Sequence, residues 1–130
     1  MIETHNESDR SWDIYQSVAK LDAKSELNWT IVKTGSHFSK QFLQVDLEGQ
    51  DSKAKIACIY LAGGKQEMEF NTRQNHLSQG TGSDLMYKGV LMGDSRTLFS
   101  GMIQVKPNAI KSDGYQANRN LILSLSLIHI

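Results

Sequence analysis

Cysteine and proline are almost absent from this sequence, which has one of each in 130 residues. A single cysteine rules out a disulfide within the chain and fits a reducing compartment. No apolar stretch approaches the roughly 18 residues that a transmembrane helix needs, so we expect no membrane segment. The chain must therefore be stabilised by an ordinary hydrophobic core, which a domain of this length can form.

Neither sign of charge is in excess, because 14 acidic residues balance 14 basic residues. Nucleic-acid binding would need a clustered basic excess, so we do not expect it. The first ten residues, MIETHNESDR, are polar and acidic, unlike the basic and apolar regions of a signal peptide. These features predict a cytoplasmic protein, and the length predicts one domain at most.

Helical periodicity is missing as well. Residues 12–21 fit both the helical period and the two-residue period of a strand in part. We interpret them as a strand, because Trp12, Ile14 and Gln16 occupy alternate positions. Strand-like runs begin near residues 42, 56, 68, 85 and 97, with turn residues such as Gly, Asp and Ser between them. This pattern predicts an all-β protein and leaves a sandwich, a barrel and a β-solenoid open.

We expect different structures for two segments in the middle of the chain. Residues 56–61, IACIYL, form a nearly continuous apolar run, which is typical of a strand covered on both faces. Residues 72–83, TRQNHLSQGTGS, are polar, and we interpret them as a connection with a flexible turn at Gly80–Thr81–Gly82.

The most informative stretch runs from Asp84 to Ser124. Its run TLFSGMIQV should bury one face, and its strand should end before Pro107, which cannot donate to a β-ladder. The expected core face of that run consists of Thr97, Phe99, Gly101, Ile103 and Val105. Further on, the amides of Gln116, Asn118 and Asn120 repeat at period two, which suits inward, hydrogen-bonded positions in a regular β-architecture.

This stretch resembles the core of the SufB/SufD family of iron–sulfur cluster assembly proteins, and the SufD branch more than the SufB branch. The resemblance extends over residues 38–124 and weakens toward the amino terminus. The residues that carry it are Lys88–Gly89, Ser95–Arg96, Phe99–Ser100–Gly101, Ile103, Val105, Ala109, Asp113, Gln116, Asn118, Asn120 and Leu121–Ser124. It implies a right-handed parallel β-helix.

The same resemblance implies a function. The chain would be a non-enzymatic scaffold subunit that acts with a SufB-like subunit and a SufC-type ATPase, and the full complex would assemble the iron–sulfur cluster. The cysteine–histidine segment and the helical domain that docks the ATPase follow this region in the family, beyond Ser124. We therefore expect residues 1–124 to be a partial core that is inactive alone and binds no cluster or other cofactor.

Two residues are weak candidates for cofactor binding. Cys58 could supply one thiolate, but a cluster needs several, and a cysteine in an apolar strand is usually a small hydrophobic residue. His76 lies in a polar segment without a cysteine or carboxylate at ligand spacing, so a hydrogen-bonded or solvated histidine is the simpler interpretation. We expect no catalytic residue and no metal site.

Other hypotheses remain open from the residues. A SufB-like scaffold is one, although its members carry ligand cysteines. A carbohydrate-active β-helix enzyme is another, because Glu67 with Glu69, or Asp46 with Glu48, could form an acid–base pair. A purely structural solenoid is the third.

The last six residues, LSLIHI, read like a translated sequencing adapter, and we expect residues 125–130 to be a non-native tail. In that case the gene would be cut at Ser124, and the bare apolar edge of the last turn would promote association between chains.

Overall fold

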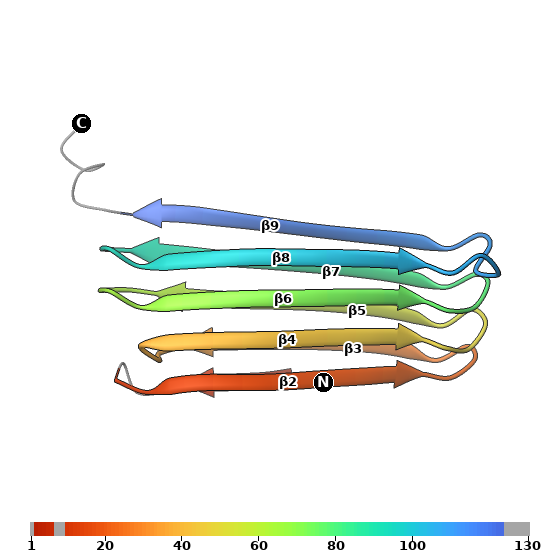
Figure 1. Cartoon of the computed structure of the whole chain (residues 1–130), viewed down its shortest axis with the longest axis horizontal. Coiled ribbons are helices and arrows are strands. Elements are labelled where there is room, and N and C mark those ends of the chain that lie inside the picture. The colour runs from red at the N-terminus through yellow and green to blue at the C-terminus, as the bar shows by residue number, and fades with distance from the viewer. Residues whose placement is uncertain (1, 7–9, 124–130) are drawn as a thin grey trace.

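The structure, a computed structural model, describes residues 2–6 and 10–123 (Figure 1). These residues form nine strands and no helix, so none of them belongs to a helix that could cross a membrane. The strands are β1 (Ile2–Asn6), β2 (Trp12–Leu21), β3 (Glu26–Thr34), β4 (Phe38–Leu47), β5 (Lys53–Ala62), β6 (Glu67–His76), β7 (Gly82–Met92), β8 (Arg96–Val105) and β9 (Asp113–Leu123). Residues 125–130 lie outside the described part.

The strands alternate between two sheets as the chain advances. One sheet has the order β1-β3-β5-β7-β9 and the other has the order β2-β4-β6-β8, and every pairing is parallel. Figure 1 shows the even strands stacked in front of the odd strands, with short loops at both ends. The chain is therefore a parallel β-solenoid of about four turns, which confirms the expected fold class.

Successive strands in the sequence start at intervals of about half of the solenoid repeat, because one turn of the solenoid contains two strands. Each turn contributes one strand to each sheet, so that Trp12 pairs with Phe38, Phe38 with Glu67, and Glu67 with Arg96. Because side chains in strands alternate in direction, every second residue of a strand faces the interior between the sheets. The core consists of these inward rows, stacked from turn to turn.

The expectation that residues 56–61 are covered on both faces is wrong. Strand β5 alternates strictly, and Ile56, Cys58 and Tyr60 are buried while Ile59 and Leu61 are 54% and 41% exposed. An apolar run has the same appearance in sequence whether its second face is buried or exposed. The outer face of this sheet is thus more apolar than an ordinary solvated face.

The interpretation of residues 72–83 as a polar connection is also wrong at both ends. Residues 72–76 continue β6, and Gly82 and Ser83 begin β7. The error has a physical cause, because Thr72, Gln74 and His76 are polar but point into the solenoid and are buried there. The turn is limited to the loop that contains Gly80.

Four aromatic rings, taken alternately from the two sheets, form the centre of the core. Tyr60 of β5 and Phe70 of β6 have ring centroids 4.6 Å apart, and Phe70 and Tyr87 of β7 are 5.1 Å apart. Phe99 of β8 continues the row at 5.2 Å from Tyr87. Tilted and edge-on contacts at this separation stabilise aromatic pairs beyond the area that they bury.

The expected core face of β8 is correct in direction, but it is less buried than expected. Phe99 and Ile103 are partly buried, whereas Val105 is 53% exposed. Among the described strands, β8 pairs with β6 alone and is the last strand of its sheet. No further described strand of that sheet packs beside its inward side chains, so they are less covered. The strand ends at Val105, two residues before Pro107, as predicted.

Removal of the Phe70 ring should destabilise the fold more than removal of the Phe99 ring. Phe70 is fully buried between two tyrosines, so we expect Phe70→Ala to lower the free energy of unfolding by about 3–5 kcal/mol. Phe99→Ala should cost clearly less, because part of that ring is already in water. Denaturant unfolding of both variants measures the difference, and equal costs would contradict the assigned burial.

Two glycines of β7 should differ in their tolerance of alanine. A Cβ on Gly89 would lie 2.0 Å from Tyr60 Cε2, whereas a Cβ on Gly82 would have Lys53 Cγ as its nearest neighbour, at 3.7 Å. We expect Gly89→Ala to displace the Tyr60 ring and lower the thermal midpoint clearly, while Gly82→Ala leaves it nearly unchanged. Thermal unfolding checks this, and a neutral Gly89→Ala would show that the ring lies elsewhere.

Candidate functional site

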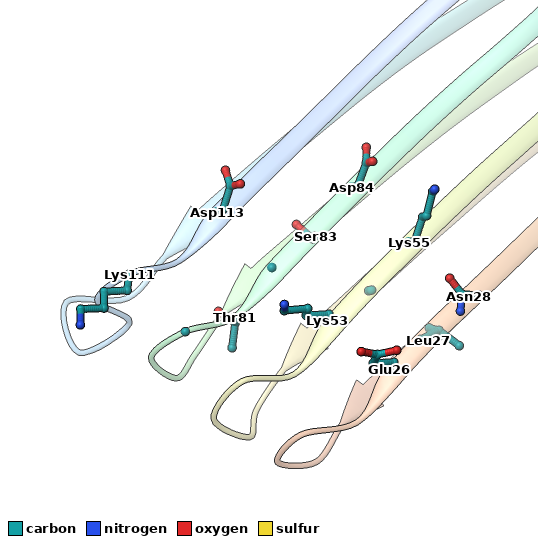
Figure 2. A pocket seen from close by; sticks show the side chains of 13 residues that line it. Glu26, Leu27, Asn28, Lys53, Lys55, Thr81, Ser83, Asp84, Lys111 and Asp113 are labelled. Atoms are coloured by element: carbon teal, nitrogen blue, oxygen red, sulfur yellow. The ribbon is translucent and has the colours of Figure 1, made fainter.

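A groove crosses the outer face of the odd-numbered sheet near the beginning of its strands. It has a volume of about 510 Å³, and its side chains come from four successive turns (Figure 2). The lining residues are Glu26, Leu27, Asn28, Lys53, Ala54, Lys55, Gly80, Thr81, Gly82, Ser83, Asp84, Lys111 and Asp113. The sequence interpretation treated Gly80–Thr81–Gly82 as a turn alone and did not predict this groove.

Charges of opposite sign alternate along the groove because of the strand register. Glu26 is beside Lys53, and Lys55 is beside Asp84. Gly82 lies between Lys53 and Asp113 and has no side chain to fill the space, which hollows the surface at that point. Mixed charge of this kind suits contact with a polar, similarly mixed surface better than capture of a simple anion or cation.

A buried polar network forms the wall behind the groove. His76, at the end of β6, is fully buried, and its Nε2 lies 2.9 Å from Ser83 Oγ while its Nδ1 lies 2.8 Å from Thr81 Oγ1. Ser83 also donates a hydrogen bond to Gln74 Oε1. Thr81 and Ser83 thus contact the groove on one side and the histidine on the other.

The hydrogen bonds of this network argue against a nucleophilic serine. Ser83 Oγ donates to Gln74 Oε1 and Thr81 Oγ1 donates to the Ser78 carbonyl, so neither hydroxyl proton is directed at the His76 ring. A serine whose proton points away from the histidine is not activated by it as a nucleophile. Burial lowers the pKa of His76, and this outweighs the opposite effects of the Thr81 backbone and the Asp113 carboxylate. His76 therefore holds two strands together as a neutral ring.

Cys58 lies in the core, away from the groove. It is 1% exposed on the inner face of β5, between Ile31 and Tyr87 in the register. Burial raises the pKa of its thiol to about 12, and the nearby Lys33 ammonium only partly offsets this increase. A protonated, enclosed thiol is a poor metal ligand, because the thiolate is the binding species.

The structure does not bring the two candidate residues together. Cys58 is in the middle of a strand of one sheet, and His76 ends a strand of the other sheet. Among the described residues there is no group of three or more histidine, cysteine, aspartate or glutamate side chains that could hold a metal ion.

The paired carboxylates considered for acid–base chemistry have other roles in the structure. Glu69 lies 3.9 Å from the Lys40 ammonium. Asp46 is buried and accepts a hydrogen bond of 2.7 Å from Asn75 Nδ2, while Glu48 is exposed in the following loop. Glu67 and Glu69 both line a hollow of about 290 Å³, but Arg96 lines it with them and Glu69 lies near Lys40, so the two carboxyl groups are not an isolated acid–base pair.

The inward position predicted for the amides of β9 agrees with the structure. Tyr60 donates to Asn118 Oδ1 at 3.0 Å and contacts Asn120 Oδ1 as well, and Gln116 accepts from Gln74 at 3.5 Å. An ion pair with a fully buried lysine was not predicted: Lys33 Nζ lies 3.0 Å from Oδ2 of the partly exposed Asp13. Inward lysine is rare, and no signal in a single sequence distinguishes it from an outward one.

Stability should depend on pH through His76. In the unfolded chain this histidine takes up a proton below its usual pKa of about 6.5, whereas the fold keeps it neutral to lower pH. The unfolded state then binds more protons, so the free energy of unfolding should fall as the pH decreases below about 6.5. His76→Gln keeps two polar ends but cannot titrate, and it should flatten this dependence.

Urea unfolding between about pH 5 and 8 measures the effect. The control is His37→Gln, which changes an exposed histidine. Identical pH slopes for the parent chain and His76→Gln would contradict the role of His76.

Three curated relatives illustrate the similarity of this chain to known proteins. It is 33% identical over 86 residues to the SufBD family protein ABCI8, chloroplastic, of Arabidopsis thaliana, which covers 66% of this chain and 15% of that protein. It is 28% identical over 102 residues to ycf24 of Pyropia yezoensis, covering 78% of this chain and 21% of the relative. It is 26% identical over 114 residues to slr0074 of Synechocystis, covering 85% and 24%.

These relatives are all described as iron-sulfur cluster assembly SufBD family proteins, and the chain spans about a quarter of their length or less. No solved structure matches the chain. The family description "SUF system FeS cluster assembly, SufBD core domain" matches residues 1–126, which is nearly the whole chain. Together with the parallel β-solenoid, this match shows that the chain belongs to the SufBD core domain family of iron–sulfur cluster assembly proteins.

Proposed function

We propose that this chain is the partial core of a SufD-like scaffold subunit of the SUF iron–sulfur cluster assembly complex. The subunit acts in the cytoplasm with a SufB-like subunit and a SufC-type ATPase, and it is not itself an enzyme. The ATPase contact belongs to a helical region that follows the core, and the complex as a whole builds the cluster. Residues 1–124 alone are inactive on this proposal.

The state of Cys58 is the observation that carries the SufD-like assignment. A subunit that holds the nascent cluster needs several accessible thiolates, since iron–sulfur clusters are bound mainly by cysteine. The one cysteine of this chain is enclosed between Ile31 and Tyr87, and its raised pKa keeps it protonated. For this part of the subunit, these properties support a role in shaping the assembly over a role in binding the cluster.

The stacked architecture supports the scaffold role in a second way. A solenoid offers long rows of repeated positions on two outer faces, and such surfaces suit extended contact with other proteins. Among the described residues, the buried Lys33 and His76 are used in internal contacts, the first with Asp13 and the second with Thr81 and Ser83. The outer charges of the groove are available for recognition.

Reconstitution of the complex tests the proposal. The protein that contains this chain should copurify with a SufB-like subunit and a SufC-type ATPase of the same source when the three are produced together. Anaerobic reconstitution should then give iron–thiolate absorption in the complex and none in this protein alone. Cys58→Ala should leave the iron and sulfide content of the complex unchanged, because the thiol is enclosed.

Two results would contradict the proposal. One is a cluster on this protein alone that disappears in Cys58→Ala, which would make Cys58 a ligand. The other is a failure to associate when the SufB-like subunit is present, with both proteins folded by circular dichroism.

A further inference from the structure

The outer face of the odd-numbered sheet carries an apolar patch at the carboxyl-terminal ends of its strands. Leu61, Val90 and Leu121 are adjacent in the register on β5, β7 and β9, and Met92 and Leu123 extend the patch by one row. Leu61 and Ile59 are substantially exposed although β5 has a hydrogen-bonded neighbour on each side. Leu61 and Ile59 are therefore exposed because nothing in the described part of the chain covers the outer face of the sheet at this point, and not because they lie at a sheet edge.

A row with three small residues and one methionine, here called the small row, runs beside the patch, across the strands and along the solenoid axis. Thr30, Ala57 and Ala117 occupy three of its positions, and Met86 lies between the two alanines. Neighbouring strands are about 4.8 Å apart, so four strands extend over a distance that about ten residues of an α-helix would cover. A sheet face of this kind is normally buried against another element.

Two cations adjoin the patch on its strand-start side. Lys88 and Arg119 are neighbours on β7 and β9, at the border between the small row and the apolar rows. Both are exposed, and neither takes part in a salt bridge identified among the described residues. Two adjacent cations without such partners, next to exposed leucines, form a surface that is complementary to carboxylates flanking an apolar stripe.

The other outer face of the solenoid provides an internal comparison. On the even-numbered sheet Lys40 is paired with Glu69, and Arg73 donates to Gln104 Oε1 at 3.0 Å. Asp46 accepts from both Gln44 and Asn75. These polar groups of the even-numbered sheet are thus partnered within that face, whereas no ion pair is identified for Lys88 and Arg119 among the described residues.

We propose that the patch formed by Ile59, Leu61, Val90, Met92, Leu121 and Leu123, with Lys88 and Arg119 at its border, is the docking surface for an amphipathic helix with an acidic flank. The helix lies along the solenoid axis over the row of Leu61, Val90 and Leu121, with its acidic flank toward the small row. Its apolar stripe covers the leucines, and its carboxylates pair with Lys88 and Arg119. This surface is separate from the charged groove and does not depend on the SufD-like assignment.

Site-specific photo-crosslinking in the cells that make the protein tests the proposal. A benzophenone amino acid replaces Leu61, and a matched control places it at Leu98, an exposed residue of the even-numbered sheet. Sequencing of the crosslinked peptide at position 61 should reveal a segment with apolar residues spaced three and four apart and with acidic residues beside them. The Leu98 control should not capture this segment.

Charge reversal provides the second measurement. The double variant Lys88→Glu with Arg119→Glu should reduce the yield of the position-61 adduct at least about tenfold, because carboxylates would then face carboxylates. Lys20→Glu, an exposed change on the other outer face, should leave the yield unchanged. Circular dichroism of both variants confirms that each is folded.

Several outcomes would overturn the proposal. They are the absence of a protein adduct at position 61, an adduct to a second copy of this chain, a captured segment without acidic residues, and a yield that charge reversal does not change. Recovery of the protein on vesicles of phosphatidylcholine and phosphatidylserine, dependent on Lys88 and Arg119, would assign the surface to a membrane instead.

Discussion

The in-register stacking of parallel strands is the constraint on which the whole structure depends. Each strand forms its backbone hydrogen bonds with the turns before and after it, so a side chain at one position always lies beside its counterparts in those turns. The rows that result must be filled along the axis, and a poor choice in one turn affects its neighbours. The row Lys33, Tyr60, Gly89 and Asn120 illustrates this dependence, since the large ring of Tyr60 is accommodated by the missing side chain of Gly89.

The same constraint explains how the polar interior arises. The strands are long, and their inner rows contain glutamine, asparagine, histidine and lysine as well as apolar residues. Buried polar groups are tolerated when they have hydrogen-bond partners, and the stacked geometry supplies some of these partners from the facing sheet, although Ser39 Oγ and Thr72 Oγ1 are buried without one among the described residues. The Tyr87 hydroxyl donating to Gln41 Oε1, at 3.0 Å, is one such contact between the two sheets.

Strand positions and fold class were largely predictable from the sequence, whereas the division between inside and outside was predictable only in part. Alternation located the strand at residues 12–21 correctly, and the family resemblance selected the solenoid among the all-β folds. His76 was missed as a core residue because a polar inward row has the same appearance as a loop. The groove could not be predicted, because it depends on which charged residues lie beside one another in the strand register. Gly82 contributes to the groove because it has no side chain to fill the space.

One contact of the core has a consequence for cooperativity. In a simple solenoid each turn interacts with its nearest neighbours, so an array can unfold progressively from one end. The Tyr60 hydroxyl reaches past β7 and donates to Asn118 on β9, two positions away in the sheet. This contact adds a second-neighbour coupling, because β9 cannot separate without breaking a hydrogen bond to β5. Strands β5, β7 and β9 should therefore open as one unit in hydrogen exchange. A partner bound to any one of them would slow the amide exchange of all three.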